Sequence, residues 1–191
     1  MGNVAYKNEY YEVKDELLDG KVVAMSPSAG MNHAFVTDNI LNIFKNFLKG
    51  KPCKAFGNLN VYLTDKDRTI PDVMIVCDKN IMKPNGIYGA PDLIVEVLSP
   101  STANKDKGYK KNLYEKCGVN EYWLADAANM SIEVHLLQNG KYVLDNVYSI
   151  YADWQLELLN EDEKSAVIYK FSPSQFPDMV VDLEQVFEDM M

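Results

Sequence analysis

The sequence predicts a mixed α/β fold, in which helices pack on a central mixed sheet that is flanked by β-hairpins. Three observations predict it: a helical pattern at residues 33–48, two apolar runs at 71–77 and 92–98, and a second helical segment followed by another strand. This order is typical of helices layered on a sheet. Because the chain has 191 residues, 47% of them hydrophobic, we expect one domain over residues 1–191.

The N-terminal part is predicted to form a hairpin and then a helix. Asp19-Gly20 favours a type I′ turn, which needs positive φ at both central positions, so residues 10–26 are expected to form a hairpin. Residues 33–48 place apolar side chains three and four positions apart, which is typical of a helix with one buried face. Gly50 is expected to end this helix.

Strands and a second helix follow. The apolar runs at 71–77 and 92–98 are typical of strands buried on both faces, and a loop is expected between them at 78–90. A helix is predicted at 105–117, because Gly118 is a suitable C-terminal cap. The other predicted elements are strands at 60–63, 121–126 and 165–171, two strands of a meander at 131–137 and 141–147, and an acidic tail at 172–191 ending in a short helix.

The net charge of −9 argues against a nucleic-acid partner, but the charge is unevenly distributed. Residues 153–191 contain ten acids and two lysines, whereas residues 39–64 contain four lysines and no acid. Residues 101–117 contain five lysines against two acids. The acidity is therefore largely C-terminal, and the two basic stretches either contact a nucleic-acid backbone or decorate exposed helix faces.

Cysteine usage and hydropathy predict a cytoplasmic protein. The three cysteines, Cys53, Cys77 and Cys117, are far apart in the sequence and form no CxxC pair, so we expect reduced, buried thiols. The polar N-terminus resembles no secretory signal, and no apolar run has the roughly 18 residues that a membrane helix needs. We expect no membrane association and no organic cofactor.

Two acids interrupt the predicted buried strands. Glu96 lies in the middle of an otherwise aliphatic strand, and Asp72 opens the other one. A buried carboxylate needs a cation, a metal or hydrogen-bond donors. Asp92 lies four residues before Glu96 and should share its face of the strand, although a capping or orienting role suits it better.

Two carboxylates on neighbouring strands would favour a hard divalent cation such as Mg²⁺ or Mn²⁺. Such an ion polarises a phosphoryl oxygen and lowers the pKa of a bound water, which is the equipment for phosphodiester hydrolysis. The structural alternative is that each acid caps a helix or pairs with a lysine or arginine.

A lysine beside the metal would stabilise charge in the transition state. Leu98 occupies the strand position two residues after Glu96, so the strand itself supplies no lysine. On the next helix, Asp106 and Lys110 are four residues apart and share the face that Leu113 directs to the sheet. Lys110 is therefore our candidate, with an ordinary surface ion pair to Asp106 as the alternative.

Three segments also carry a family resemblance. Ile70-Pro71-Asp72-Val73, the run from Pro91 through Glu96 to Ser101, and the run from Gly118 through Trp123 to Asp126 resemble the Uma-type restriction endonuclease family, formerly a domain of unknown function. The likeness runs from about residue 10 to residue 137. The family is similar to the PD-(D/E)xK nucleases, so the resemblance implies a restriction-endonuclease-like core.

The resemblance also implies an activity and a site. It implies a DNA endonuclease in which Asp72 and Glu96 bind Mg²⁺ or Mn²⁺, together with the Val97 carbonyl, while Lys110 replaces the lysine missing at Leu98. Glu16 is the candidate for an additional acid, and His33 is a candidate to contact phosphate or to cap the helix. We expect a homodimer, since enzymes that cut both strands often pair two sites. The alternative is an inactive, nucleic-acid-binding or accessory member of the same fold.

Overall fold

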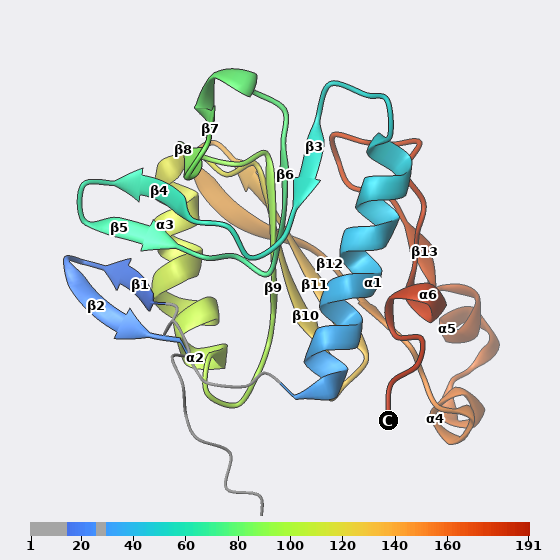
Figure 1. The fold of residues 1–191 in the computed structure, drawn as a ribbon. Helices are drawn as coiled ribbons and strands as arrows, with labels where there is room; N and C mark the ends of the chain where they lie inside the picture. The colour runs from blue at the N-terminus through green and yellow to red at the C-terminus, as the bar shows by residue number, and fades with distance from the viewer. Residues whose placement is uncertain (1–14, 26–29) are drawn as a thin grey trace, which may run out of the picture.

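In a computed structural model of the chain, the structure describes residues 15–25 and 30–191. Two six-stranded sheets lie side by side. One is larger because its strands are longer, and helices cover both of its faces (Figure 1). This arrangement confirms the predicted mixed α/β fold.

The larger sheet, here the central sheet, contains the apolar strands predicted from the sequence. Its order is β12-β11-β10-β9-β6-β3, in which β9 and β10 are parallel and the other neighbours antiparallel. Every residue of β6 and β9 is buried, as expected for strands covered on both faces. The strands are β3 (Lys54–Phe56), β6 (Val73–Val76), β9 (Leu93–Val97), β10 (Glu121–Asp126), β11 (Ser131–Gln138) and β12 (Lys141–Ser149).

The second sheet, here the side sheet, holds the N-terminal hairpin. Its order is β2-β1-β5-β4-β8-β7, and the hairpin turns at Asp19 and Gly20, both with positive φ as predicted. Residues 10–14 and Ser26 of the predicted hairpin lie outside the described residues. The strands are β1 (Asp15–Leu18), β2 (Lys21–Ala24), β4 (Val61–Thr64), β5 (Asp67–Thr69), β7 (Met82–Lys83) and β8 (Gly86–Tyr88).

Helices cover opposite faces of the central sheet because its side chains alternate. On β6, Val73 and Ile75 join the core cluster under α1 (Met31–Leu48). Met74 and Val76 join the second cluster, on the face of α3 (Lys111–Cys117). The segment before α3 consists of α2 (Ala103–Lys105) and a π-helical turn, η2 (Asp106–Lys110). Gly118 caps α3 with a φ of 84°, as the sequence predicts.

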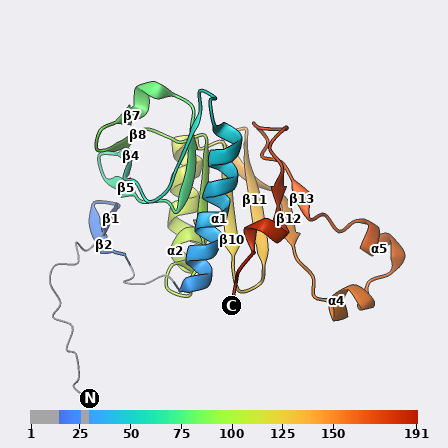
Figure 2. The same ribbon diagram turned by 45° about the vertical axis from the view of Figure 1, so that its right-hand side comes forward.

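The C-terminal segment is part of the core, although the sequence suggested an acidic tail. Leu183 and Val186 of α6 (Leu183–Val186) are fully buried in the cluster under α1, and Val181 of β14 (Val181–Asp182) joins them. Glu184, Glu188 and Asp189 are exposed, whereas Asp182 is buried and pairs with Lys170, so one stretch can be both acidic and part of the core. Figure 2 shows α4 (Asp153–Leu158) and α5 (Glu161–Ser165) reaching away from the sheet, and β13 (Lys170–Phe171) returning to it.

Several short elements differ from the expectations. The predicted loop at 78–90 contains the 3₁₀ turn η1 (Lys79–Ile81) and strands β7 and β8, and only the last two residues of the predicted strand 165–171 form β13. Strands β3 and β5, each three residues long, were not predicted. These pieces are too short to show a periodic pattern, and their pairing partners alone define them as strands.

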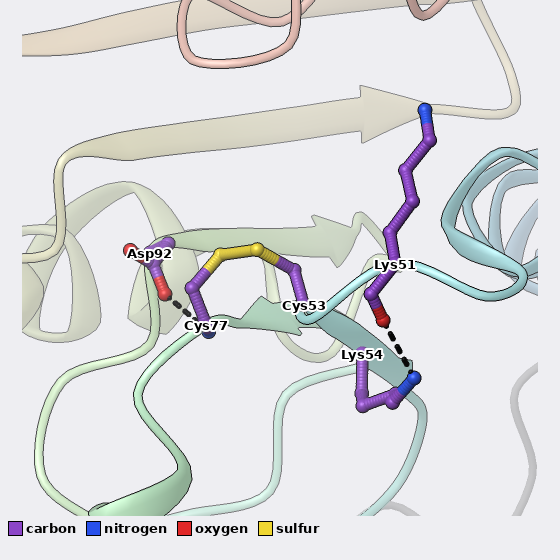
Figure 3. The surroundings of a disulfide bond; sticks show 5 residues. All are labelled: Lys51, Cys53, Lys54, Cys77 and Asp92. Atoms are coloured by element: carbon purple, nitrogen blue, oxygen red, sulfur yellow. Dashed lines mark hydrogen bonds between the residues drawn. A yellow bond between two sulfur atoms is a disulfide. The ribbon is translucent and has the colours of Figure 1, made fainter.

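The cysteines correct the expectation of three reduced thiols. Cys53 and Cys77 form a disulfide (Figure 3), and Cys117 is free. The unpredicted strand β3 explains the pairing. Lys54 faces Val76 across the antiparallel β3–β6 ladder, so Cys53, just before Lys54, comes close to Cys77, just after Val76. Among the helices that the structure describes, none is long and apolar enough to cross a membrane.

Candidate active site

A pocket of about 300 Å³ lies where the side sheet, the central sheet and the N-terminal end of α1 meet. Five carboxylates line it, from β1, α1, the start of β6, β9 and η2. The basic side chains of Lys105, Lys110 and His33 line the same pocket. The acidic residues of the lining are Glu16, Asp38, Asp72, Glu96 and Asp106.

Glu96 faces the α3 side of the central sheet. Its neighbours Val95 and Val97 belong to the cluster under α1, so strand alternation directs Glu96 to the opposite face. It is 3% exposed, and its Oε1 atom accepts a hydrogen bond from Lys110 Nζ at 3.1 Å. The same oxygen accepts a hydrogen bond from the Tyr114 hydroxyl at 2.7 Å.

Asp72 lies just before β6 and is joined to β9 through the backbone. Its Oδ2 accepts a hydrogen bond from the Val97 amide at 2.8 Å. Because Val97 directly follows Glu96, this bond holds the Asp72 carboxylate close to that glutamate. His33 Nε2, from the first turn of α1, lies 3.4 Å from Asp72 Oδ2.

Lys110 lies at the centre of the acidic cluster. Its Nζ is 2.8 Å from Glu16 Oε1, 3.1 Å from Glu96 Oε1 and 3.4 Å from Asp106 Oδ1. The π-helical turn that holds Asp106 and Lys110 is the kind of helix irregularity that often occurs at functional sites. The predicted approach of Lys110 to the strand acids is therefore present in the structure.

Glu16 connects the N-terminal hairpin to this cluster. It is fully buried, and its Oε1 also accepts a hydrogen bond from the Ile70 amide at 3.1 Å. Lys105 Nζ, from α2, donates to Oε2 at 3.0 Å. Two lysines thus share one carboxylate from β1, which brings the side sheet to the pocket.

Burial and crowding change the protonation of these groups. Burial raises the pKa of Glu96, and the nearby Asp106, Asp72 and Glu16 raise it further. The pKa of Glu96 reaches about 8, although the ammonium of Lys110 opposes the rise. Burial alone would lower the pKa of Lys110, but its three carboxylate neighbours hold it well above the usual range. Lys110 is therefore charged at neutral pH, while Glu96 is the carboxyl that takes up a proton most readily.

The pKa values of the flanking groups follow the same logic. Burial would raise the pKa of Glu16, but the ammonium of Lys110 lowers it overall. Burial raises the pKa of Asp106, which Lys110 only partly offsets. For His33, burial lowers the pKa, but its contact with Asp72 raises it overall.

The structure separates Asp92 from the other candidates. It shares the strand face of Glu96, as expected, but lies before the opposite end of β9, about 13 Å away at strand spacing. Its Oδ2 accepts a hydrogen bond from the Cys77 amide at 2.7 Å, beside the disulfide in Figure 3, so it orients the backbone there. The pocket brings together Asp72, Glu96, Val97, Lys110, Glu16, Asp106 and His33.

Two residues that bond to the predicted acids were missed by sequence reasoning. Tyr114 follows Lys110 by four residues, so the same helix spacing that selected Lys110 could have selected it. Lys105 could not have been selected, because its contact with Glu16 joins segments 89 residues apart.

The pocket residues fit a divalent cation. Mg²⁺ is usually held by one or two carboxylates plus water and substrate oxygens, and Asp72, Glu96 and the Val97 backbone are such a donor set. Asp106 Oδ1 is buried and has no hydrogen-bond partner among the described residues, and its contact is the ion pair with Lys110 Nζ at 3.4 Å. Within residues 15–25 and 30–191, no three His, Cys, Asp or Glu side chains form a ready-made metal cluster. Water and substrate would complete the coordination.

Comparison with known proteins gives the family. Residues 5–165 match the model of the family described as "Uma2: Putative restriction endonuclease". The chain belongs to this family. It is 31% identical over 138 residues to the uncharacterized protein slr1290 of Synechocystis sp., and the match covers 70% of this chain and 72% of that protein. It is 26% identical over 125 residues to the uncharacterized protein sll1609 of the same organism, covering 63% and 70% of the two chains.

A solved structure has the same fold. The crystal structure of a putative nuclease of DUF820 from Anabaena variabilis matches with a TM-score of 0.68 at 19% sequence identity. The match covers 94% of this chain and 92% of that one, so this Uma2 chain shares the fold of that protein.

The fold also positions the two basic stretches of this Uma2 chain. His33 at the start of α1 lines the pocket, whereas Lys45 lies in the last turn of that 18-residue helix, roughly 18 Å along its axis. In the second stretch, Lys107 pairs with Glu133, while Lys105 and Lys110 bind the buried acids. Three of the five lysines in the second stretch therefore form ion pairs with acids of the same chain.

Proposed function

We propose that this chain is a Mg²⁺- or Mn²⁺-dependent DNA endonuclease that hydrolyses phosphodiester bonds. The observation that carries the proposal is the meeting of Asp72, Glu96 and Lys110, from three separate elements, in one pocket. Membership of the Uma2 family supports a nuclease, and the fold likeness to the Anabaena protein agrees with it.

Asp72 and Glu96 would hold the ion, together with the carbonyl of Val97. Their carboxylates belong to adjacent strands that pair Val73 with Val95, and the Asp72–Val97 hydrogen bond keeps them in register. When bound, the ion would polarise a phosphoryl oxygen and lower the pKa of a coordinated water. A positive charge there would also favour the ionised form of Glu96.

Lys110 would act as a cation and hydrogen-bond donor. Because its carboxylate neighbours raise its pKa, it keeps its proton at neutral pH and is unsuited to remove one from water. Its ammonium can orient the attacking water and stabilise the negative charge that develops on the phosphate. Glu16 and Asp106 hold this ammonium close to Glu96.

DNA would be the substrate, and a homodimer would present two pockets to its two strands. The alternative is an inactive member that binds nucleic acid without cutting it. Leu98 at the usual lysine position favours this alternative, as does the sharing of Lys110 among three acids.

Plasmid cleavage tests the proposal. Supercoiled plasmid would be incubated with the full chain and Mn²⁺ or Mg²⁺, and nicked and linear products measured on gels. We expect cleavage by the wild type, none by Asp72→Ala, and wild-type cleavage by Asp78→Ala, which removes an exposed acid beyond the other end of β6. Equal cleavage by wild type and Asp72→Ala would contradict the site. Plasmid binding without cleavage would support the inactive alternative.

A further inference from the structure

Tyr114 makes the shortest hydrogen bond to Glu96. Its hydroxyl donates to Oε1 at 2.7 Å, whereas Lys110, at 3.1 Å from the same oxygen, is shared with Glu16 and Asp106. Tyr114 is fully buried and follows Lys110 by four residues. Helix spacing therefore directs both side chains at the same strand residue.

Both donors reach the same oxygen of the Glu96 carboxylate. In the part of the chain that the structure describes, no donor is hydrogen-bonded to the other oxygen, Oε2. A carboxylate has two oxygens with two acceptor sites each, so one fixed oxygen leaves the other free for a further partner. Outer residues often hold metal-binding side chains in this way, and their loss typically lowers metal affinity by about 10- to 100-fold.

We propose that Tyr114 is a positioning residue, whose hydroxyl fixes Oε1 of Glu96 and leaves Oε2 free to bind the divalent cation. This inference rests on the proposed function, because that function assigns the cation to Glu96. The role belongs to the hydroxyl and not to the ring. The ring packs edge-on against Tyr122, with centroids 5.3 Å apart, and would do so equally as phenylalanine.

Tyr114 and Lys110 contribute differently to Glu96. Lys110 places a positive charge beside Glu96, but the same ammonium also pairs with Glu16 and Asp106. Tyr114 is a neutral donor, because an ordinary phenol keeps its proton at neutral pH. A neutral donor orients the carboxylate without cancelling the negative charge that a cation needs.

Calorimetric titration with Mn²⁺ tests the inference on the full chain. Tyr114→Phe should raise the dissociation constant for Mn²⁺ at least about 10-fold. The matched control is Tyr142→Phe, because the Tyr142 hydroxyl donates to the Val119 carbonyl at 2.9 Å and does not line the pocket. This control should bind within about twofold of wild type, since no Glu96 contact is lost.

Two failures can be told apart. Saturable binding by wild type with equal affinity in Tyr114→Phe would overturn the positioning role and leave the proposed function intact. No binding by wild type would overturn both. If Tyr114→Phe is too unstable for calorimetry, urea unfolding with and without Mn²⁺ gives the same comparison. Mn²⁺ should then stabilise wild type and Tyr142→Phe more than Tyr114→Phe.

Discussion

Lys110 Nζ lies closer to Glu16 of the N-terminal hairpin, at 2.8 Å, than to Glu96 of the central sheet, at 3.1 Å. The lysine therefore joins the two sheets as well as the two acids. Because Glu16 is fully buried and the Ile70 amide and Lys105 also bind it, the hairpin is held to the rest of the protein at this carboxylate.

Glu16→Ala should lower the free energy of unfolding by about 3 kcal/mol, because it leaves a buried ammonium with fewer partners. The matched control is Asp15→Ala on the same strand. The Asp15–Arg68 ion pair is partly exposed, so its loss should cost less than about 1 kcal/mol. Urea unfolding measures both values, and similar losses in the two variants would show that Glu16 has no special structural role.

Lys110→Met should reduce plasmid cleavage at least about 100-fold, since a charged donor beside the developing charge is lost. Lys107→Met, on the same π-helical turn, removes only an exposed ion pair with Glu133 and should change the rate little. Gel assays at saturating Mn²⁺ compare the two variants. A Lys110→Met enzyme as active as Lys107→Met would exclude Lys110 from catalysis.

Glu121 should make the protein relatively less stable as the pH rises. Burial raises the pKa of Glu121 in the folded state, although Ser174 and Trp123 donate to it. The folded protein therefore keeps a proton at pH values where the unfolded chain has lost it, so stability falls as the pH rises through the folded pKa. Glu121→Gln should gain stability relative to wild type as the pH rises above the unfolded-state pKa of about 4.3, measured by urea unfolding. A difference between the two proteins that does not change with pH would refute this.

Reducing the disulfide should lower the free energy of unfolding by about 3 kcal/mol. This is the value expected for a loop closed across a sequence separation of 24. Cys53→Ser should be destabilised by a similar amount and should not respond further to dithiothreitol. Cys117→Ser removes the free cysteine and should still respond to the reductant like wild type. Equal stability of oxidised and reduced wild type would indicate that the bond does not stabilise the fold.

Leu183→Ala should destabilise the protein by about 3 kcal/mol, because Leu183 is fully buried in the cluster under α1. Val180→Ala is the control in the same segment, since Val180 is 58% exposed and should cost less than about 0.5 kcal/mol. Thermal unfolding would compare them. If Leu183→Ala matched the control, the C-terminal segment would be peripheral to the core.

The sequence predicted the elements that carry their own pattern. The strands around Val73 and Leu93 and the helix ending at Gly118 are local signals, and all three are present. Glu96 stood out because an acid within an aliphatic strand requires a partner. Lys110 followed from helix phase, and the structure places it beside that acid.

The features that were missed depend on distant residues. The strand Lys54–Phe56 exists only because it pairs with β6, and without it the Cys53–Cys77 bond could not be foreseen. The C-terminal segment was read from its net charge, whereas Leu183 and Val186 occupy one buried face. Lys105 meets Glu16 only through the full tertiary structure.

The Cys53–Cys77 bond closes the chain from β3 to β6 into a covalent ring. The ring passes through both sheets, because β4 and β5 belong to the side sheet while β3 and β6 belong to the central one. A single peptide-bond cut inside the ring would leave the two pieces joined through sulfur. The segment that carries Asp72 would thus stay attached to the molecule after one proteolytic nick until a reductant opened the bridge.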